Sequence, residues 1–123
     1  MSDDEVKVHK RSTFNLNQLT IMGHVGAPPV LDFSRDGLPM LKFGVSSDER
    51  DFNGKVEFHP VIVFGERAEK LYEIIKSGSL VFCQGPLNYN SWIDRKKRRQ
   101  SPRLIPTIIK VLRDGRGGKR GEE

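Results

Sequence analysis

Two segments near the start of the chain alternate apolar and polar residues with a period of two. Residues 19–25 place Leu, Ile, Gly and Val at every second position, and residues 41–45 do the same with Leu, Phe and Val. This period is typical of β-strands that turn one face to a core and the other to solvent. Residues 26–29 and 34–37 between them have the composition of turns. We therefore expect two strands joined by an irregular connection.

A third segment, residues 56–64, is apolar at both parities, which indicates a strand covered on both faces. Asn53 and Gly54 before it are a strong hairpin-turn signal. After it, four apolar residues recur at helical spacing and predict one helix over residues 66–76. This stripe consists of Ala68, Leu71, Tyr72 and Ile75. Gly78 stands where a residue in the left-handed conformation would end the helix.

Two more strands are expected towards the end of the chain. Residues 79–87 include an apolar run, and residues 103–112 are rich in β-branched residues, with Pro106 indicating an edge or a bulge. The predicted order is strand–strand–strand–helix–strand–strand, with residues 95–100 in the loop that connects the last two strands. An all-β chain with one small helix in this order is typical of the OB-fold, a five-stranded Greek-key barrel that binds oligonucleotides or oligosaccharides. A mixed α+β sandwich is the alternative that the order leaves open.

A chain of 123 residues has the length of one domain. We expect the barrel over residues 14–113, a flexible polar N-terminus over 1–13 and a disordered, Gly-rich charged tail over 114–123. The acidic start has no apolar stretch behind it, which argues against a secretory signal. No apolar run is long enough to cross a membrane. These features predict a cytoplasmic protein.

The sequence offers little for catalysis or metal binding. Cys83 is the single cysteine, so the chain has no intramolecular disulfide and no cysteine cluster for zinc. It lies in an apolar run and is interpreted as a core residue. His9, His24 and His59 are far apart in the sequence. We therefore expect no enzyme activity, no metal site and no cofactor.

The positive charge is concentrated in one short segment. Residues 17–94 hold 7 Lys/Arg and 10 Asp/Glu, a net charge of −3, whereas residues 95–113 hold 8 Lys/Arg and no acid. The flanking segments, 1–16 and 114–123, are each neutral, so this basic segment accounts for the whole net charge of +5. A focused excess of cations is typical of polyanion binding, and nucleic acid is the commonest polyanion. A solvated surface is the alternative for such a run.

Aromatic residues supply the second requirement of single-strand binding, because bases stack on flat rings. The candidates are Phe52, Phe58, Phe64, Tyr89 and Trp92. Phe58 and Phe64 share a parity on the third strand, and an ordinary core position is the alternative for both. Phe52 lies in a polar turn, and Tyr89 and Trp92 lead into the cationic run. The predicted phosphate contacts are Lys42, Arg95, Lys96, Lys97, Arg98, Arg99 and Arg103.

Three motifs resemble the bacterial-type single-stranded DNA-binding protein (SSB) family. Residues 17–29, NQLTIMGHVGAPP, resemble its opening strand, and residues 56–69, VEFHPVIVFGERAE, resemble its third strand and helix start. Residues 76–87, KSGSLVFCQGPL, followed by Trp92, resemble its fourth strand and downstream tryptophan. The resemblance covers about residues 15–112. It implies an OB-fold that binds single-stranded DNA largely independently of sequence in replication, recombination or repair.

The resemblance also implies roles for particular residues. Phe58 stands where the family usually places a stacking Trp, Phe64 stands at its stacking Phe, and Trp92 and Phe52 match further aromatics. His59 matches a histidine at a subunit interface, which implies a homotetramer, with a dimer as the alternative. The sequence departs from the family at four groove positions where cations are usual. These are Pro60, Glu66, Asn88 and Asn90.

The end of the chain departs from the family as well. Cellular members usually end in an acidic, apolar tip that recruits replication and repair proteins, and this sequence ends in Gly-Glu-Glu. The departure favours a specialised member encoded by a bacterium, a phage or a plasmid. Two alternatives stay open: a primosomal replication-restart protein that works mainly through protein partners, and an RNA-binding OB-fold protein.

Overall fold

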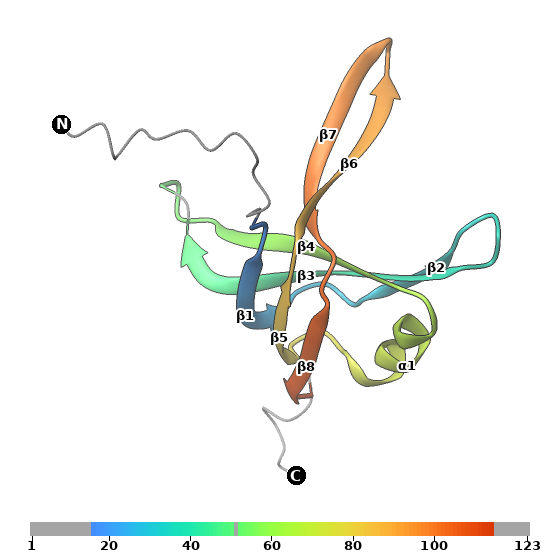
Figure 1. The fold of residues 1–123 in the computed structure, drawn as a ribbon. Helices are drawn as coiled ribbons and strands as arrows, with labels where there is room; N and C mark the ends of the chain where they lie inside the picture. The colour runs from blue at the N-terminus through green and yellow to red at the C-terminus, as the bar shows by residue number, and fades with distance from the viewer. Residues whose placement is uncertain (1–15, 51, 115–123) are drawn as a thin grey trace, which may run out of the picture.

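The computed structural model describes residues 16–50 and 52–114, which form eight strands and one helix (Figure 1). The predicted flexible N-terminus, residues 1–13, and all of the predicted tail except Asp114 lie outside these residues. The elements, in chain order, are β1 (Leu19–Val25), β2 (Val30–Phe33), β3 (Pro39–Arg50), β4 (Val56–Phe64), α1 (Glu66–Ile74), β5 (Leu80–Gly85), β6 (Leu87–Asp94), β7 (Lys97–Leu104) and β8 (Ile108–Arg113).

The strands form one sheet in the order β6-β7-β4-β3-β1-β5-β8, with β2 paired to β3. All pairs are antiparallel except β4 and β7, which run parallel where Val61 lies opposite Leu104. The three residues 105–107 connect β7, on one side of the sheet, to β8, which pairs with β5 on the other side. The sheet must therefore curl on itself. The helix follows β4 and precedes β5, so the predicted OB-fold order is confirmed.

The last predicted strand, residues 103–112, is divided in two. Its first part ends β7 at Leu104, and its second part forms β8. Pro106 lies in the break, as expected of a residue without a backbone N–H. The guanidinium of Arg67 on α1 donates hydrogen bonds to the carbonyl oxygens of Pro106, at 2.6 Å, and Thr107, at 3.1 Å. The helix therefore holds the connection in place.

The basic run was predicted to be a connecting loop, and this prediction is wrong. Residues 87–104 form a long hairpin of β6 and β7, joined at Arg95 and Lys96. The short strand β2 was not predicted either. Residues 88–100 are exposed along both strands, so they show no alternation of buried and exposed positions. The strands of the hairpin form through backbone pairing, and the pattern of apolar residues in the sequence gives no sign of this pairing.

The helix is shorter than the predicted range of 66–76. It ends at Ile74, because Ile75 adopts an extended conformation with φ −80° and ψ 126°. This turns the Ile75 side chain into the core, where it is 1% exposed. Gly78 has a φ of 90°, as its position suggested, but it serves the turn into β5 rather than capping the helix.

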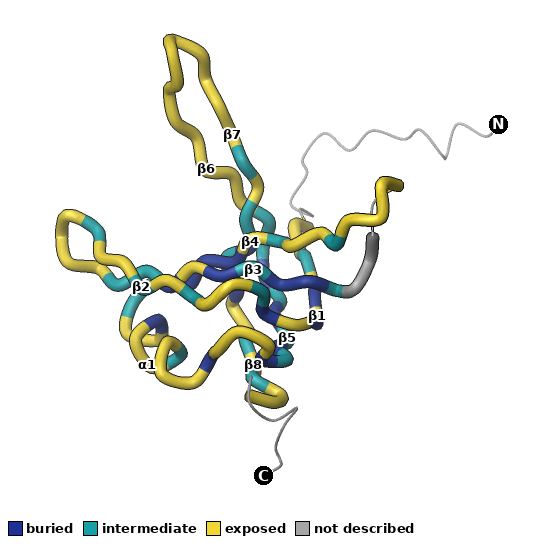
Figure 2. Tube along the Cα trace, turned by 180° about the vertical axis from the view of Figure 1, so that it is seen from behind, coloured by how far each residue is buried: buried dark blue, intermediate teal, exposed yellow. Residues whose placement is uncertain are grey.

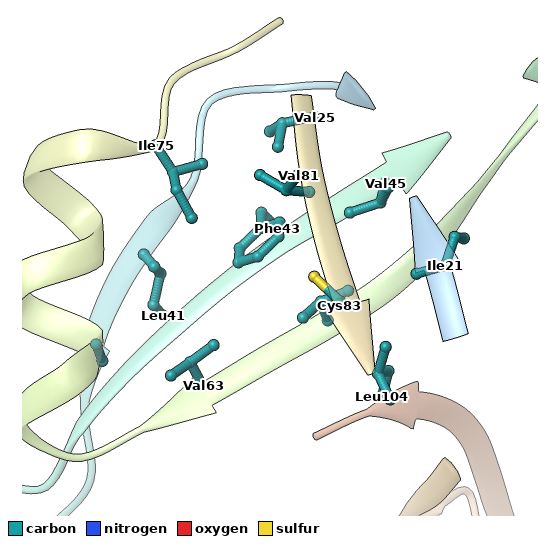
Figure 3. Close-up of a cluster of buried hydrophobic side chains, with 12 residues drawn as sticks. Ile21, Val25, Leu41, Phe43, Val45, Val63, Ile75, Val81, Cys83 and Leu104 are labelled. Atoms are coloured by element: carbon teal, nitrogen blue, oxygen red, sulfur yellow. The ribbon is translucent and has the colours of Figure 1, made fainter. Parts of the chain in front are cut away.

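The core lies inside the curl of the sheet, against α1 (Figure 3). Leu41, Val45, Val63 and Val81 are completely buried there. Cys83 is also buried, and desolvation raises the pKa of its thiol to about 12. The positive charge of Arg67 lowers this pKa, but its effect is smaller than that of desolvation. The thiol therefore stays protonated at neutral pH, which confirms Cys83 as a core residue.

Candidate nucleic-acid interface

The β6–β7 hairpin projects from the body of the protein (Figure 1), and its outer part is exposed on all sides (Figure 2). Its root is held firmly. Leu104 is 1% exposed in the core. The Asn17 side chain donates a hydrogen bond to the carbonyl oxygen of Leu87, at 2.9 Å, and accepts one from the Leu87 N–H, at 3.0 Å. The amide of Asn17 thus pairs with β6 as a backbone peptide would, and it fixes the direction in which the hairpin leaves the body.

The tip of the hairpin is a two-residue turn made by two cations. Arg95 has a φ of 52° and Lys96 a φ of 67°. Two successive residues with positive φ are typical of a type I′ turn, for which Asn-Gly is the preferred sequence. Side chains with a Cβ adopt this conformation at a cost of roughly 1–2 kcal/mol per residue. The tip therefore presents two long cations where turn geometry alone would favour small residues.

The hairpin has two faces, since residues directly opposite each other in an antiparallel pair point to the same side. One face carries Trp92 with three of the cations, in the cross-strand pairs Trp92–Arg99, Asp94–Lys97 and Asn88–Arg103. Trp92 is 45% exposed, so its ring is accessible. Nε of Arg99 lies 3.7 Å from Oδ2 of Asp94, a pair open to solvent that contributes little to stability. We call this side the Trp92 face.

The opposite face carries Tyr89, Ile93 and Arg98, in the cross-strand pairs Tyr89–Pro102 and Ile93–Arg98. Tyr89 is 55% exposed. Tyr89, Leu87 and Pro102 line an apolar pocket of about 320 Å³ that also includes His59. The predicted cations are therefore divided: Lys97, Arg99 and Arg103 accompany Trp92, Arg98 accompanies Tyr89, and Arg95 and Lys96 occupy the tip. The sequence alone could not separate them.

The aromatic residues of β4 lie on the outside of the curled sheet. Phe58 pairs with Ser46 of β3 and Phe64 pairs with Met40, at positions of the same parity. Phe58 is 52% exposed. Phe64 is partly buried, and the Arg103 guanidinium of the Trp92 face lies 5.8 Å from its ring centroid. Neither ring belongs to the core cluster, which decides against the core alternative. The Arg103–Phe64 contact joins the hairpin to the β4 surface.

Two glycines shape the position of Phe58. A Cβ on Gly26 would lie 2.6 Å from Cε1 of the Phe58 ring, and a Cβ on Gly44 would lie 3.3 Å from its Cβ. The ring therefore rests against bare backbone on this side, and its other side is open to solvent. Sequence reasoning missed both glycines. Gly44 inside a strand was a usable signal, because such a glycine often marks a close approach.

Substituting Gly26 by Ala is expected to weaken single-strand binding without unfolding the protein. The new methyl group would meet the outer edge of the Phe58 ring, which can swing aside, so the stacking geometry is lost while the core is untouched. We expect a loss of up to the roughly 1–3 kcal/mol that one stacked base contributes. Fluorescence anisotropy with a dT oligonucleotide measures it. In a Phe58→Leu background, Gly26→Ala should have no further effect; an equal additional loss would mean that Gly26 acts elsewhere.

The remaining predicted residues lie apart from this cluster or at its margin. Phe52 is 97% exposed in the β3–β4 connection, so its ring is accessible but little packing orients it. Lys42 points outward on β3 opposite Ile62, and its Nζ lies 3.7 Å from Oδ2 of Asp32. Ile62 is 4% exposed on the same outer side.

Within residues 16–50 and 52–114, no three His, Cys, Asp or Glu residues are placed to hold a metal ion. In the same part of the chain, no helix could span a membrane.

A curled sheet of OB-fold order, with exposed rings on its outer side and a cationic hairpin beside them, defines the class of OB-fold nucleic-acid-binding proteins. The sequence model of the Single-strand binding protein family matches residues 16–112. The chain therefore belongs to this family, and the resemblance inferred from the three motifs is confirmed.

Relatives and a solved structure agree with this assignment. Single-stranded DNA-binding protein 1 of Xylella fastidiosa (strain 9a5c) is 29% identical over 106 residues, covering 80% of this chain and 78% of that protein. Single-stranded DNA-binding protein of Rhizobium meliloti (strain 1021) is 31% identical over 120 residues, covering 87% and 68%. A Plasmodium falciparum SSB complex with ssDNA superposes with a TM-score of 0.68 at 21% identity, covering 83% of this chain and 99% of that one, which shows the shared fold.

Proposed function

We propose that the protein binds single-stranded DNA largely independently of sequence and protects it during replication, recombination or repair. The observation that carries this proposal is the Arg103–Phe64 contact, which brings the cationic hairpin next to the aromatic surface of β4. Cations and stacking rings side by side are what an unpaired strand requires. Membership of the single-strand binding protein family and the names of its relatives support the same function. The proposed role is binding, with no catalytic step.

The proposed strand crosses the β4 surface and continues along the Trp92 face. Bases stack on Phe58, Phe64 and Trp92, and Phe52 and Tyr89 extend the aromatic surface at its margins. The phosphates are neutralised by Lys97 and Arg99 of the Trp92 face, by the tip residues Arg95 and Lys96, and by Arg98 and Lys42 in outer positions. Arg103 adds its positive charge where the hairpin meets the β4 surface. Nothing in the described residues favours the restart-protein or RNA-binding alternatives.

We further propose a homo-oligomer in a reducing, cytoplasm-like compartment. The outer sides of β1, β5 and β8 form a face with apolar residues in neighbouring strands, including Met22 opposite Phe82, and Ile108 and Leu112 on β8. Met22 is 55% and Leu112 50% exposed, as expected of a surface that a second copy covers. His59, the predicted interface residue, lies half-buried on β4 away from this face. Native mass measurement distinguishes tetramer from dimer and from monomer.

Trp92 supplies a direct test of the proposed function. It is the only tryptophan, so a change in intrinsic fluorescence on adding a dT oligonucleotide reports on this side chain alone. We expect quenching on binding, and we expect Trp92→Ala to weaken binding by roughly 1–3 kcal/mol, the contribution of one stacked base. Trp92→Phe should retain most of the affinity. Tyr72→Ala, which removes a comparably exposed ring on α1, serves as the control and should bind normally. Binding without quenching would exclude Trp92 from the interface.

A further inference from the structure

A concave site lies where the root of the hairpin meets the outer side of the sheet. It is an open hollow of about 430 Å³, a volume within the roughly 300–1,000 Å³ usual for small-molecule sites. We call it the hairpin-root pocket. Its floor is apolar and comes mainly from Gly44, Pro60 and Ile62. Its polar side chains are Lys42 of β3, Asn90 of β6 and Arg103 of β7. The strand β3 and the two strands of the hairpin thus contribute one polar group each.

The chemistry of this pocket suits a nucleobase better than a phosphate. A phosphate is strongly hydrated and gains nothing from an apolar floor, whereas a base presents an apolar face and a polar edge. The charge of Lys42 is already partly compensated by Asp32, whose Oδ2 lies 3.7 Å from Nζ. A small number of polar groups above an apolar surface is the usual arrangement in a site that recognises the polar edge of a ligand by hydrogen bonds.

Arg103 is the residue best placed to form hydrogen bonds with the polar edge of a base in this pocket. Its guanidinium is held over the Phe64 ring at 5.8 Å, which restricts the orientation of the plane. Its Nε is buried and has no hydrogen-bond partner within the described residues. A buried donor without an acceptor is destabilising, so a ligand that brings one acceptor to Nε and a second to a neighbouring terminal nitrogen would relieve the deficit. The guanidinium can only donate hydrogen bonds, and it donates them as a planar fork.

We propose that the hairpin-root pocket binds a guanine base of the single strand in preference to the other three bases. This inference rests on the proposed function and adds a base preference to one of its subsites. Guanine presents O6 and N7 as two adjacent acceptors, the edge that an Arg fork matches best. On the corresponding edge, adenine and cytosine present an exocyclic amine, a donor that faces the donors of Arg103 unfavourably. Thymine presents the single acceptor O4 beside its methyl group, so it can accept only one of the two hydrogen bonds. Asn90 can both donate and accept, so it complements the remaining polar edge.

The experiment compares dT oligonucleotides of about 15 nucleotides, near the upper end of OB-fold site sizes, that carry one central dG, dA, dC or dT. A single substitution avoids guanine self-association. We expect the dG oligonucleotide to bind roughly five- to tenfold more tightly than all-dT, within the discrimination that one bidentate contact provides. The analogue 7-deazaguanine lacks the N7 acceptor but retains the stacking surface. It should bind no better than dT.

Two conservative variants assign the preference to Arg103. Arg103→Lys keeps the charge but loses the planar fork, so it should abolish the dG preference, measured as the ratio of dG to dT affinity within the same variant. Arg98→Lys, the same change on the other face of the hairpin, should retain the preference. Equal affinity for dG and dT, a stronger preference for another base, or full retention with 7-deazaguanine would overturn the inference and leave the proposed function standing. Failure to bind dT at all would overturn the proposed function.

Discussion

Replacing the five consecutive cations Arg95–Arg99 by glutamine is expected to remove most of the salt dependence of single-strand binding. Each phosphate neutralised on a single strand contributes about −0.7 to the slope of log K against log salt. With these five residues, Lys42 and Arg103 all contributing, the slope should be near −5, so raising the salt from about 50 to 200 mM weakens binding roughly 900-fold. With only Lys42 and Arg103 left, the same change should weaken binding about sevenfold.

A variant of equal net charge shows whether the position of these cations matters. It replaces five cations elsewhere on the described surface by glutamine: Arg35, Lys55, Lys70, Lys76 and Lys110. We expect this control to keep a slope close to that of the unmodified protein, because its changes lie outside the hairpin. Anisotropy titrations at four or more salt concentrations give both slopes. If the two variants lose the same salt dependence, the total charge governs binding and the hairpin has no special part in it.

Substituting Gly23 by Ala is expected to have the largest effect on stability. Gly23 lies in β1 where β3 bends across it, and a Cβ there would lie 1.9 Å from the carbonyl oxygen of Ser46 and 3.2 Å from Cα of Ser47. Both atoms are backbone, so no rotamer change can remove the overlap. Overpacking usually destabilises a fold by about 1–3 kcal/mol, and a clash with the backbone should reach or exceed the upper limit. The midpoint of thermal unfolding should fall by roughly 10–20 °C.

Gly44→Ala is the matched control for this substitution. Gly44 also lies inside a strand of the same sheet, but a Cβ there would meet only the Phe58 side chain, at 3.3 Å. We expect a shift of no more than a few degrees. Circular dichroism melts of the two variants measure the difference. Similar melting of Gly23→Ala and the unmodified protein would mean that β1 and β3 do not approach as closely as described.

Most of the fold could be predicted because its core strands alternate. The period-two pattern located β1 and part of β3, and the helical stripe located α1 within two residues of its end. The hairpin could not be located in this way, since residues 88–100 are exposed on both faces and alternation carries no information there. Arg95 and Lys96 also lack the Asn-Gly composition that announces a type I′ turn.

The candidate site could be predicted as a set of residues but not as a surface. The sequence indicated the aromatic rings and the cations, yet which of them share a face depends on register. The pairing of Trp92 with Arg99 and of Asn88 with Arg103 separates Arg98 from its neighbours. Likewise, Lys42, Asn90 and Arg103 come together only because β7 joins β4 at Leu104. The roles of the individual residues in binding stay predictions.

The length of the hairpin has a consequence for how fast a strand is captured. β6 spans eight residues, Leu87–Asp94, and at about 3.3 Å per residue the arm extends on the order of 25 Å. The Debye length at physiological ionic strength is about 8 Å. The hairpin, residues 87–104, carries a net charge of +5, whereas residues 17–86 and 105–114 carry a net charge of −1, and the cations at the tip stand several screening lengths from most of them. An approaching strand thus meets a positive arm before it meets the nearly neutral body, which enlarges the capture radius and favours rapid association.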